Sequence, residues 1–158
     1  MDPTPRFEVD HMLEKLGKYL RILGFDADWE RAKRTHELVE KANAEGRVFL
    51  TRNSRVEAQF PRPESIHFVR AEDPVEGLRE VVEALGLDPR ARLFARCIRC
   101  NVELEELSEL GEHAARVIPE VRARHRRFWR CPRCGTIFWR GTHVENTCAK
   151  LGIPPPEP

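Results

Sequence analysis

The sequence lacks any long run of apolar residues. Its apolar stretches are only a few residues long, whereas a helix needs about 20 to cross a bilayer. The first residues contain neither a basic cluster nor an apolar segment, so they do not resemble a signal peptide. Hydrophobic residues make up 41% of the chain and charged residues 34%, a composition typical of a soluble globular protein. We therefore expect a cytoplasmic protein without a membrane partner.

The sequence also has little net charge, +1 at pH 7. This balance excludes no class of partner, so the distribution of charge along the chain matters more. Residues 1–94 carry a net charge of −2, and residues 95–158 carry +3. The basic excess is local, because residues 121–134 hold six arginines and no acidic residue. We expect a polyanion such as nucleic acid to bind there.

The chain has five cysteines, and their spacing is informative. Four of the five cysteines form two Cys-x-x-Cys pairs, Cys97 with Cys100 and Cys131 with Cys134. Two such pairs supply four thiolates to one tetrahedral zinc ion and leave no open position, so the zinc should be structural. Disulfides are the alternative, but a reducing cytoplasm disfavours them, and a redox Cys-x-x-Cys normally occurs singly. Cys148 is expected to be a small buried residue.

Hydrophobic periodicity predicts an α/β domain in the N-terminal part of the chain. Apolar or alternating runs predict strands, and apolar residues at spacings of three and four predict helices. In order, we expect strand 7–9, helix 12–23, strand 25–29, helix 37–44, strand 47–51, strand 66–69 and helix 74–85. This order favours a mostly parallel sheet. Thr35 and Asp73 are the expected N-caps of the second and third helices.

The region around the cysteines is predicted to form a zinc ribbon. Residues 128–130 and 137–139 flank the second cysteine pair as two arms of a hairpin, with Gly135 at the turn. We therefore expect an α/β domain over residues 1–94 and a ribbon over 95–150. The proline-rich end of the chain favours an extended backbone, so residues 151–158 are expected to form a disordered tail.

Several polar residues follow the predicted strands. Ligands of open α/β sheets bind at the carboxyl ends of the strands. Carboxylates meeting there would bind Mg²⁺ or Mn²⁺ and support attack of a metal-activated water on a phosphodiester. Asp10 is equally consistent with an N-cap, Asp73 is better explained as one, and Glu37 fits an acid favoured by the helix dipole. The candidates at this edge are Asp10, Asp26, Asp28, Arg52, Asn53, Arg70, Glu72 and Asp73.

Several motifs, taken in order, resemble a known family. They are Phe7-x-Val9-Asp10-x-Met12-Leu13, Leu20-Arg21-x-Leu23-Gly24-Phe25-Asp26, Glu45-Gly46-Arg47-Val48-x-Leu50-Thr51-Arg52, Asp73-Pro74-x-Glu76-x-Leu78 and Phe128-Trp129-Arg130-Cys131-Pro132-x-Cys134-Gly135. Together they resemble the Mut-seven C-terminal RNase domain family over nearly the whole chain. The resemblance implies a PIN-like three-layer α/β nuclease domain followed by a small zinc ribbon.

The resemblance also implies a set of catalytic residues. Asp10 matches the first acid of the family, at the tip of the first strand. The family usually reads Thr-Arg-Asp where this chain reads Thr51-Arg52-Asn53, and it places an acid where Thr35-His36 precedes Glu37. The implied site therefore consists of Asp10 with Glu37 and Asn53 assisting a Mg²⁺ or Mn²⁺ ion, and Arg52 contacting phosphate. His143 matches a family position to which we assign no role.

The sequence is consistent with two functions. The first is a metal-dependent ribonuclease that acts on RNA, with the ribbon as a nucleic-acid-binding module. The alternative is a nucleic-acid-binding or adaptor protein with a degenerate nuclease site, which the absence of two expected carboxylates, at Thr35 and Asn53, favours.

The ribbon hairpin combines aromatic side chains with arginines. Aromatic faces stack on bases and guanidinium groups pair with phosphates, so we expect Trp129 and Trp139, with Arg126, Arg127, Arg130 and Arg133, to bind RNA or single-stranded nucleic acid. Adjacent residues on a strand point to opposite faces. One aromatic residue of each arm should therefore be core, and the other is left for a ligand or for packing on the α/β domain.

Overall fold

A four-stranded parallel sheet forms the centre of the N-terminal part. The computed structural model describes residues 4–156. All neighbouring strands are parallel, and their order in space is β2-β1-β3-β4. The predicted parallel sheet is therefore confirmed. The strands are β1 (Phe7–Val9), β2 (Ala27–Asp28), β3 (Val48–Thr51) and β4 (Ile66–Phe68).

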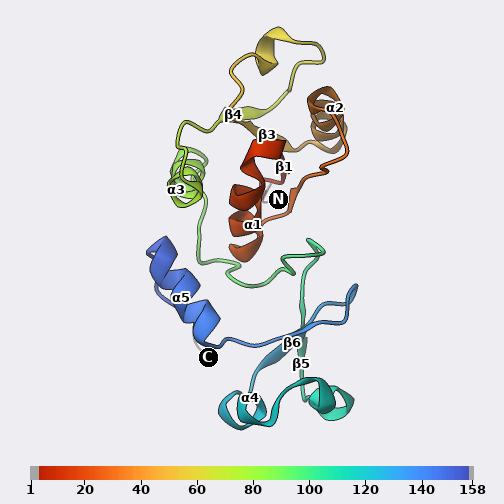
Figure 1. Ribbon diagram of the computed structural model, residues 1–158, viewed down its shortest axis with the longest axis vertical. Helices are drawn as coiled ribbons and strands as arrows, with labels where there is room; N and C mark the ends of the chain where they lie inside the picture. The colour runs from red at the N-terminus through yellow and green to blue at the C-terminus, as the bar shows by residue number, and fades with distance from the viewer. Residues whose placement is uncertain (1–3, 157–158) are drawn as a thin grey trace.

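Helices cover both faces of this sheet (Figure 1). On one face, α1 and α3 pack together over Phe7 and Val9, which belong to the largest hydrophobic core. On the other face, α2 packs on Phe49 in a separate core. Strand alternation explains the division, because Phe7 and Val9 point to one side while Glu8 and Phe49 point to the other. The helical segments are η1 (His11–Leu13), α1 (Glu14–Ile22), α2 (Thr35–Glu45), η2 (Val56–Ala58) and α3 (Pro74–Ala84).

The helix starts correct one prediction and confirm another. Asp73 caps α3 as expected, since its carboxylate accepts the backbone N–H groups of Val75 and Glu76. Thr35 is not a cap but the first residue of α2, and the N-cap position belongs to Arg34. The Glu37 carboxylate accepts the Arg34 N–H at 3.1 Å. The start of α2 is therefore held from within the helix, which a search for a preceding Ser or Thr cannot detect.

The C-terminal part contains a small three-stranded sheet. The predicted hairpin is present as β6 (Phe128–Arg130) and β7 (Ile137–Phe138), and a third strand, β5 (Glu105–Leu107), pairs antiparallel with β6. Phe128 and Ile137 are buried with Val117 in a core of their own. Two short helical segments, η3 (Gly111–Arg116) and α4 (Pro119–Arg124), lie between β5 and β6.

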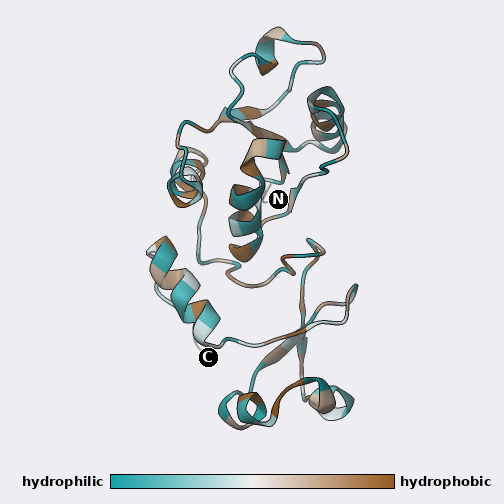
Figure 2. Cartoon of the chain, viewed as in Figure 1, coloured by the Kyte–Doolittle hydropathy of each residue, from teal (hydrophilic) through white to brown (hydrophobic). Residues whose placement is uncertain are grey.

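The last helix, α5 (Thr142–Leu151), returns to the first core (Figure 1). Its buried residues Val144, Cys148 and Leu151 pack with residues of α1 and α3, so Cys148 is the small buried residue that we expected. In Figure 2, hydrophobic and hydrophilic residues alternate along these helices, as in helices buried on one side. Ile153 also packs against this core, although it lies in the predicted tail. Residues 157–158 of that tail lie outside the described residues.

Candidate functional site

The four cysteines of the two pairs converge on one point. Their sulfur atoms all lie within 4.8 Å of one another, and the sulfur atoms of Cys97 and Cys134 are 4.0 Å apart. Zinc–sulfur bonds of about 2.3 Å in a tetrahedron place sulfur atoms roughly 3.8 Å apart. The donor set and its spacing therefore fit one zinc ion, and the fourfold coordination leaves no position for a substrate.

The two cysteine pairs fold into equivalent loops, which we call the first and second knuckle. In both loops the residue after the second cysteine has a positive φ, 57° at Asn101 and 76° at Gly135. Each of these residues donates its N–H to the carbonyl oxygen of the first cysteine of its own pair, at 2.9 Å in both cases. Glycine and asparagine tolerate this left-handed conformation. The backbone thus presents both thiols of each pair toward the metal.

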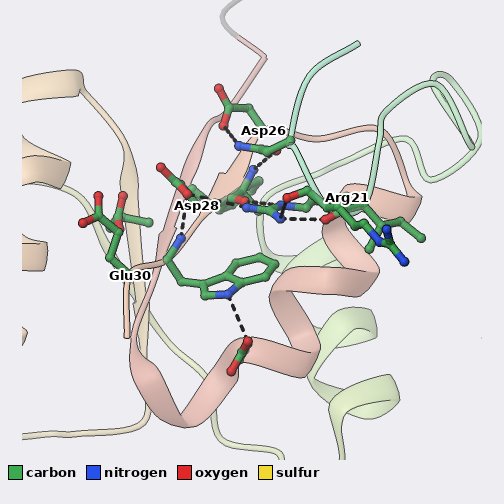
Figure 3. A network of polar contacts seen from close by, with 12 residues as sticks. Arg21, Asp26, Asp28 and Glu30 are labelled. Atoms are coloured by element: carbon green, nitrogen blue, oxygen red, sulfur yellow. Dashed lines mark hydrogen bonds and ion pairs between the residues drawn. The ribbon is translucent and has the colours of Figure 1, made fainter. Parts of the chain in front are cut away.

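Polar contacts attach the first knuckle to the sheet (Figure 3). Asn101 donates to Asp26 Oδ1 at 2.6 Å and accepts the N–H of Ala27 at 3.2 Å. Arg21 donates to the carbonyl oxygens of Ala27 and Ile98, both at 2.7 Å, and its guanidinium lies over the ring of Trp29. Asp26 was one of the sequence candidates at this edge, but Asn101 and Arg21 were missed, because neither an Asn after a cysteine nor an Arg on an apolar helix indicates a contact between the two parts of the chain.

Asp10 and Thr51 meet at the carboxyl edge of the sheet. Asp10 follows β1, is 1% exposed, and accepts the Thr51 hydroxyl at 2.7 Å and the His11 N–H at 2.9 Å. Thr51 ends β3, the neighbour of β1. The chain runs from β1 to β2 on one side and then crosses to β3 on the other, so this pair lies at the switch point where ligands of parallel sheets bind. Thr51 was quoted in the sequence motif but was given no role.

The other predicted catalytic residues have local partners. Glu37 binds the Arg34 N–H, and Asn53 Oδ1 accepts the Arg55 N–H at 3.0 Å in the turn after β3. The Asn53 N–H donates to the Thr51 hydroxyl at 3.0 Å, and that hydroxyl donates to Asp10. The backbone of Asn53 is therefore linked to Asp10 through Thr51. Arg52 lines a cavity of about 50 Å³ that extends to the start of α3.

No acidic cluster resembles the cysteine cluster. Among residues 4–156, the four cysteines are the only group of three or more histidine, cysteine or acidic side chains close enough to share one ion. Asp10 and Glu37 therefore belong to no such group among the described residues. Asp10 is the one carboxylate at the switch point with buried, oriented oxygen atoms.

A second charged cluster lies between the sheet and α2. Glu8, in the middle of β1, is fully buried, and the Lys41 ammonium lies 3.2 Å from its carboxylate. Lys41 also contacts Asp28 at the end of β2. Burial raises the pKa of Glu8 to about 7, against the opposing effect of Lys41. For Asp28, the hydrogen bond and the charge of Lys41 outweigh burial and lower the pKa.

The predicted nucleic-acid-binding residues of the ribbon differ in exposure and in their partners. Arg126 and Arg133 are exposed, whereas Arg127 is paired with Glu106 at 2.8 Å. Arg130 is half-buried, and its Nε atom is buried without a hydrogen-bond partner among the described residues. Trp129 and Trp139 are half-buried as well. They do not form an open surface, because both line a cavity between the ribbon, α1 and α5.

An open basic groove runs between α1 and the two knuckles. Its volume is about 670 Å³, and Asp28 is its one acidic lining residue. Within residues 4–156, no ion pair involves Lys18, Arg99 or Arg133. Cations free of acidic partners attract phosphates. The groove is lined by Lys18, Arg21, Asp28, Trp29, Ile98, Arg99, Cys100 and Arg133.

Comparison with known proteins agrees with the expected family. No helix of the described residues is both long and apolar enough to cross a membrane. No curated protein and no solved structure matches the sequence. The model of the Mut7-C RNAse domain matches residues 5–151, which include both β1 and α5. This match covers the α/β layers, the cysteine cluster and the switch-point pair together, and the chain therefore belongs to the Mut7-C RNAse domain family.

Proposed function

We propose that this protein is a metal-dependent ribonuclease in which Asp10 is the principal catalytic carboxylate. The observation that carries the proposal is the contact between Asp10 and Thr51 at the switch point of the parallel sheet, in a chain of an RNase domain family. The hydroxyl of Thr51 fixes one carboxylate oxygen, and the N–H of His11 fixes the other. Both oxygen atoms retain lone pairs for a cation.

The residues present fit a cation that arrives with its substrate. Mg²⁺ usually keeps several water ligands and binds proteins through one or two carboxylates together with substrate phosphates. Asp10 would be the protein carboxylate, and water molecules would supply the other ligands of the ion. When bound, such an ion activates a water molecule and stabilises negative charge on the phosphate. Arg52, an exposed residue directly after β3, would hold the phosphate in place.

The basic groove supports RNA as the substrate. Its cationic side chains come from α1 and both knuckles, and Trp29, which follows β2 and is covered by the Arg21 guanidinium, lines the same groove. His11, the neighbour of Asp10, lies 3.2 Å from the carbonyl oxygen of Glu30. The groove and the carboxylate are thus connected through the loop after β2. A single strand bound along the groove would reach the carboxyl edge of the sheet.

A second function is favoured by a specific observation. The side chains of Glu37 and Asn53 accept local backbone N–H groups, and within the described chain Asp10 belongs to no group of three or more histidine, cysteine or acidic side chains that could share one ion. This arrangement favours an RNA-binding protein with a degenerate nuclease site. The two functions share the groove and the ribbon, and they differ only in chemistry at Asp10.

Cleavage of single-stranded RNA in the presence of Mn²⁺ distinguishes the two functions. We expect cleavage by the native protein and a loss of several orders of magnitude in Asp10→Asn, because the variant removes the charge of the principal ligand. The asparagine retains an oxygen for the His11 N–H and an amide for Thr51, so the fold should survive. Asp88→Asn is the matched control, since Asp88 also accepts a backbone N–H, from Arg90, but lies outside the site.

The outcomes separate the alternatives. Equal cleavage by Asp10→Asn and by the native protein would overturn the assignment of Asp10. If the native protein binds RNA without cleaving it, and Asn53→Asp gains cleavage, the degenerate site is the correct description.

A further inference from the structure

The cavity between the ribbon and the α/β part has a volume of about 120 Å³. Its walls come from the end of α1, the segment before the first knuckle, the β6–β7 hairpin and α5. Most of the lining is apolar, as in typical ligand sites. The cavity is thus formed by parts of the chain that are far apart in sequence.

Aromatic rings dominate the ribbon side of the cavity. Trp129 and Phe138 are cross-strand partners on β6 and β7 and both line it, together with Trp139. The opposite face of the same hairpin carries Phe128 and Ile137, which form the ribbon core. The ribbon core therefore does not include Trp129 and Phe138, and both rings form walls of the cavity. The guanidiniums of Arg127 and Arg140 lie 5.1 and 4.5 Å from the centre of the Trp129 ring, which leaves Phe138 as the main stacking face.

Polar groups at the cavity add cationic and hydrogen-bonding character. The Arg140 guanidinium lies 4.5 Å from the centre of the Trp129 ring. His143 and Thr147, one turn apart on α5, also line the cavity. A neutral imidazole offers one donor and one acceptor, and a hydroxyl offers both. This combination matches the edge of a nucleobase, which carries donors and acceptors in one plane.

The size of the cavity selects the ligand. The cavity of about 120 Å³ is smaller than the roughly 150 Å³ that holds one benzene molecule, so a base would enter it only in part, and the single ring of a pyrimidine fits better than the fused rings of a purine. Arg126 is exposed, Arg127 is paired with Glu106, and no acidic residue occurs in residues 121–134, so the exposed arginines of this segment suit an anionic backbone. A base in the cavity would leave its phosphates next to these arginines.

We infer that this cavity binds one pyrimidine base of single-stranded RNA. The base would lie against Trp129 and Phe138, with its polar edge toward His143 and Thr147. The inference rests on the proposed function for the presence of RNA, and it adds a base preference located away from Asp10. His143, which the family resemblance left without a role, contacts the base edge.

The test compares labelled oligouridylate and oligoadenylate of about eight nucleotides, a typical length for a single-strand site. Binding of the zinc-loaded full chain is measured by fluorescence anisotropy without added Mg²⁺ or Mn²⁺. Both RNAs carry the same phosphates, so a difference in affinity reports on the bases. We expect oligouridylate to bind about tenfold more tightly, as stacking of one base accounts for about 1–3 kcal/mol.

Variants then locate the preference. Thr147→Phe fills the cavity with a ring and should abolish the preference for oligouridylate while both RNAs still bind. Thr142→Phe, on the same helix but exposed and outside the cavity, is the matched control and should retain the preference. Zinc content and circular dichroism check folding, and if Thr147→Phe does not fold, His143→Leu should reduce the preference in its place.

Two results overturn the inference in different ways. Equal binding of the two RNAs, or a preference that survives filling of the cavity, overturns the pyrimidine site and leaves the proposed function standing. Binding of neither RNA overturns the proposed function and the pyrimidine site together.

Discussion

At the scale of single residues, Glu8 is a carboxylic acid buried completely in the middle of a strand. The Lys41 ammonium lies 3.2 Å from its carboxylate, and the charge of Arg47 also favours ionisation, but complete burial has the larger effect on its pKa. Ionisation in such a site is unfavourable because burial removes the hydration of the charge. The protonated form is therefore the stable one up to a pH of about 7.

The stability of the protein should consequently fall as the pH rises. The folded state keeps the Glu8 proton up to about pH 7, whereas the unfolded chain releases it near 4.5. Between these values the folded state binds more protons, so the free energy of unfolding decreases with pH, by up to roughly 3 kcal/mol. Glu8→Gln should remove this dependence, which urea unfolding of both proteins between pH 4.5 and 8 measures.

The control for Glu8 is an acid shifted in the other direction. His67 and two backbone N–H groups lower the pKa of Glu80 despite burial. Its ionisation stabilises the folded state above the unfolded pKa, and that contribution is lost as the pH falls. Glu80→Gln should therefore leave the Glu8 dependence intact. Identical pH profiles for the native protein and Glu8→Gln would contradict the burial argument.

At the scale of elements, the sequence predicted a helix, strand or loop wherever the residues that determine it are neighbours in the chain. The alternation in β1, the Asp73–Pro74 start of α3 and the two cysteine pairs all predicted the observed elements. Strand β5 was missed, because its residues 105–107 are Glu-Glu-Leu and two of the three are exposed. It is a strand only because β6 offers it a pairing edge, which is a tertiary effect.

The candidate site was predicted in part for the same reason. Asp10 could be placed at the end of a strand from the pattern alone, whereas its partner Thr51 depends on which strands are neighbours. The local partners of Glu37 and Asn53 depend on how α2 begins and how the chain turns after β3. Side-chain orientation of this kind is not encoded in residue spacing.

The attachment of the first knuckle can be tested at Asn101. Asn101→Gly preserves the left-handed turn but removes the hydrogen bonds to Asp26 and Ala27, and we expect a loss of roughly 1–3 kcal/mol in the free energy of unfolding. Asn101→Ala adds backbone strain of about 1–2 kcal/mol. Urea unfolding of the zinc-loaded protein measures both variants.

The second knuckle supplies the control for this prediction. Gly135 has the same conformation, and a methyl group there would meet the end of the Arg116 side chain, which can move. Gly135→Ala should therefore show the strain alone. If Asn101→Gly is as stable as the native protein, the polar contacts do not attach the knuckle.

At the scale of the whole molecule, zinc should hold the C-terminal sheet together. The three-residue core of the ribbon is too small to be stable alone, so metal binding must supply its folding free energy. We expect one zinc per chain in elemental analysis. Cys131→Ser should lose the metal, and hydrogen exchange should then show loss of protection in residues 96–139.

Cys148 provides the matched control for the metal. It is buried in the first core and lies outside the cysteine cluster, so Cys148→Ala should keep one zinc per chain. A native protein purified without zinc, with four freely titrating thiols, would contradict the site.

The position of α5 also affects how the chain folds during its synthesis. Val144, Cys148 and Leu151 complete the core that β1 and α1 begin, yet they leave the ribosome after every other part of it. Domains generally fold as they emerge, N-terminal part first, but here the nascent α/β core stays open on one side until the ribbon has been made. Both cysteine pairs emerge before α5, so the growing chain exposes its complete metal site before its main core closes.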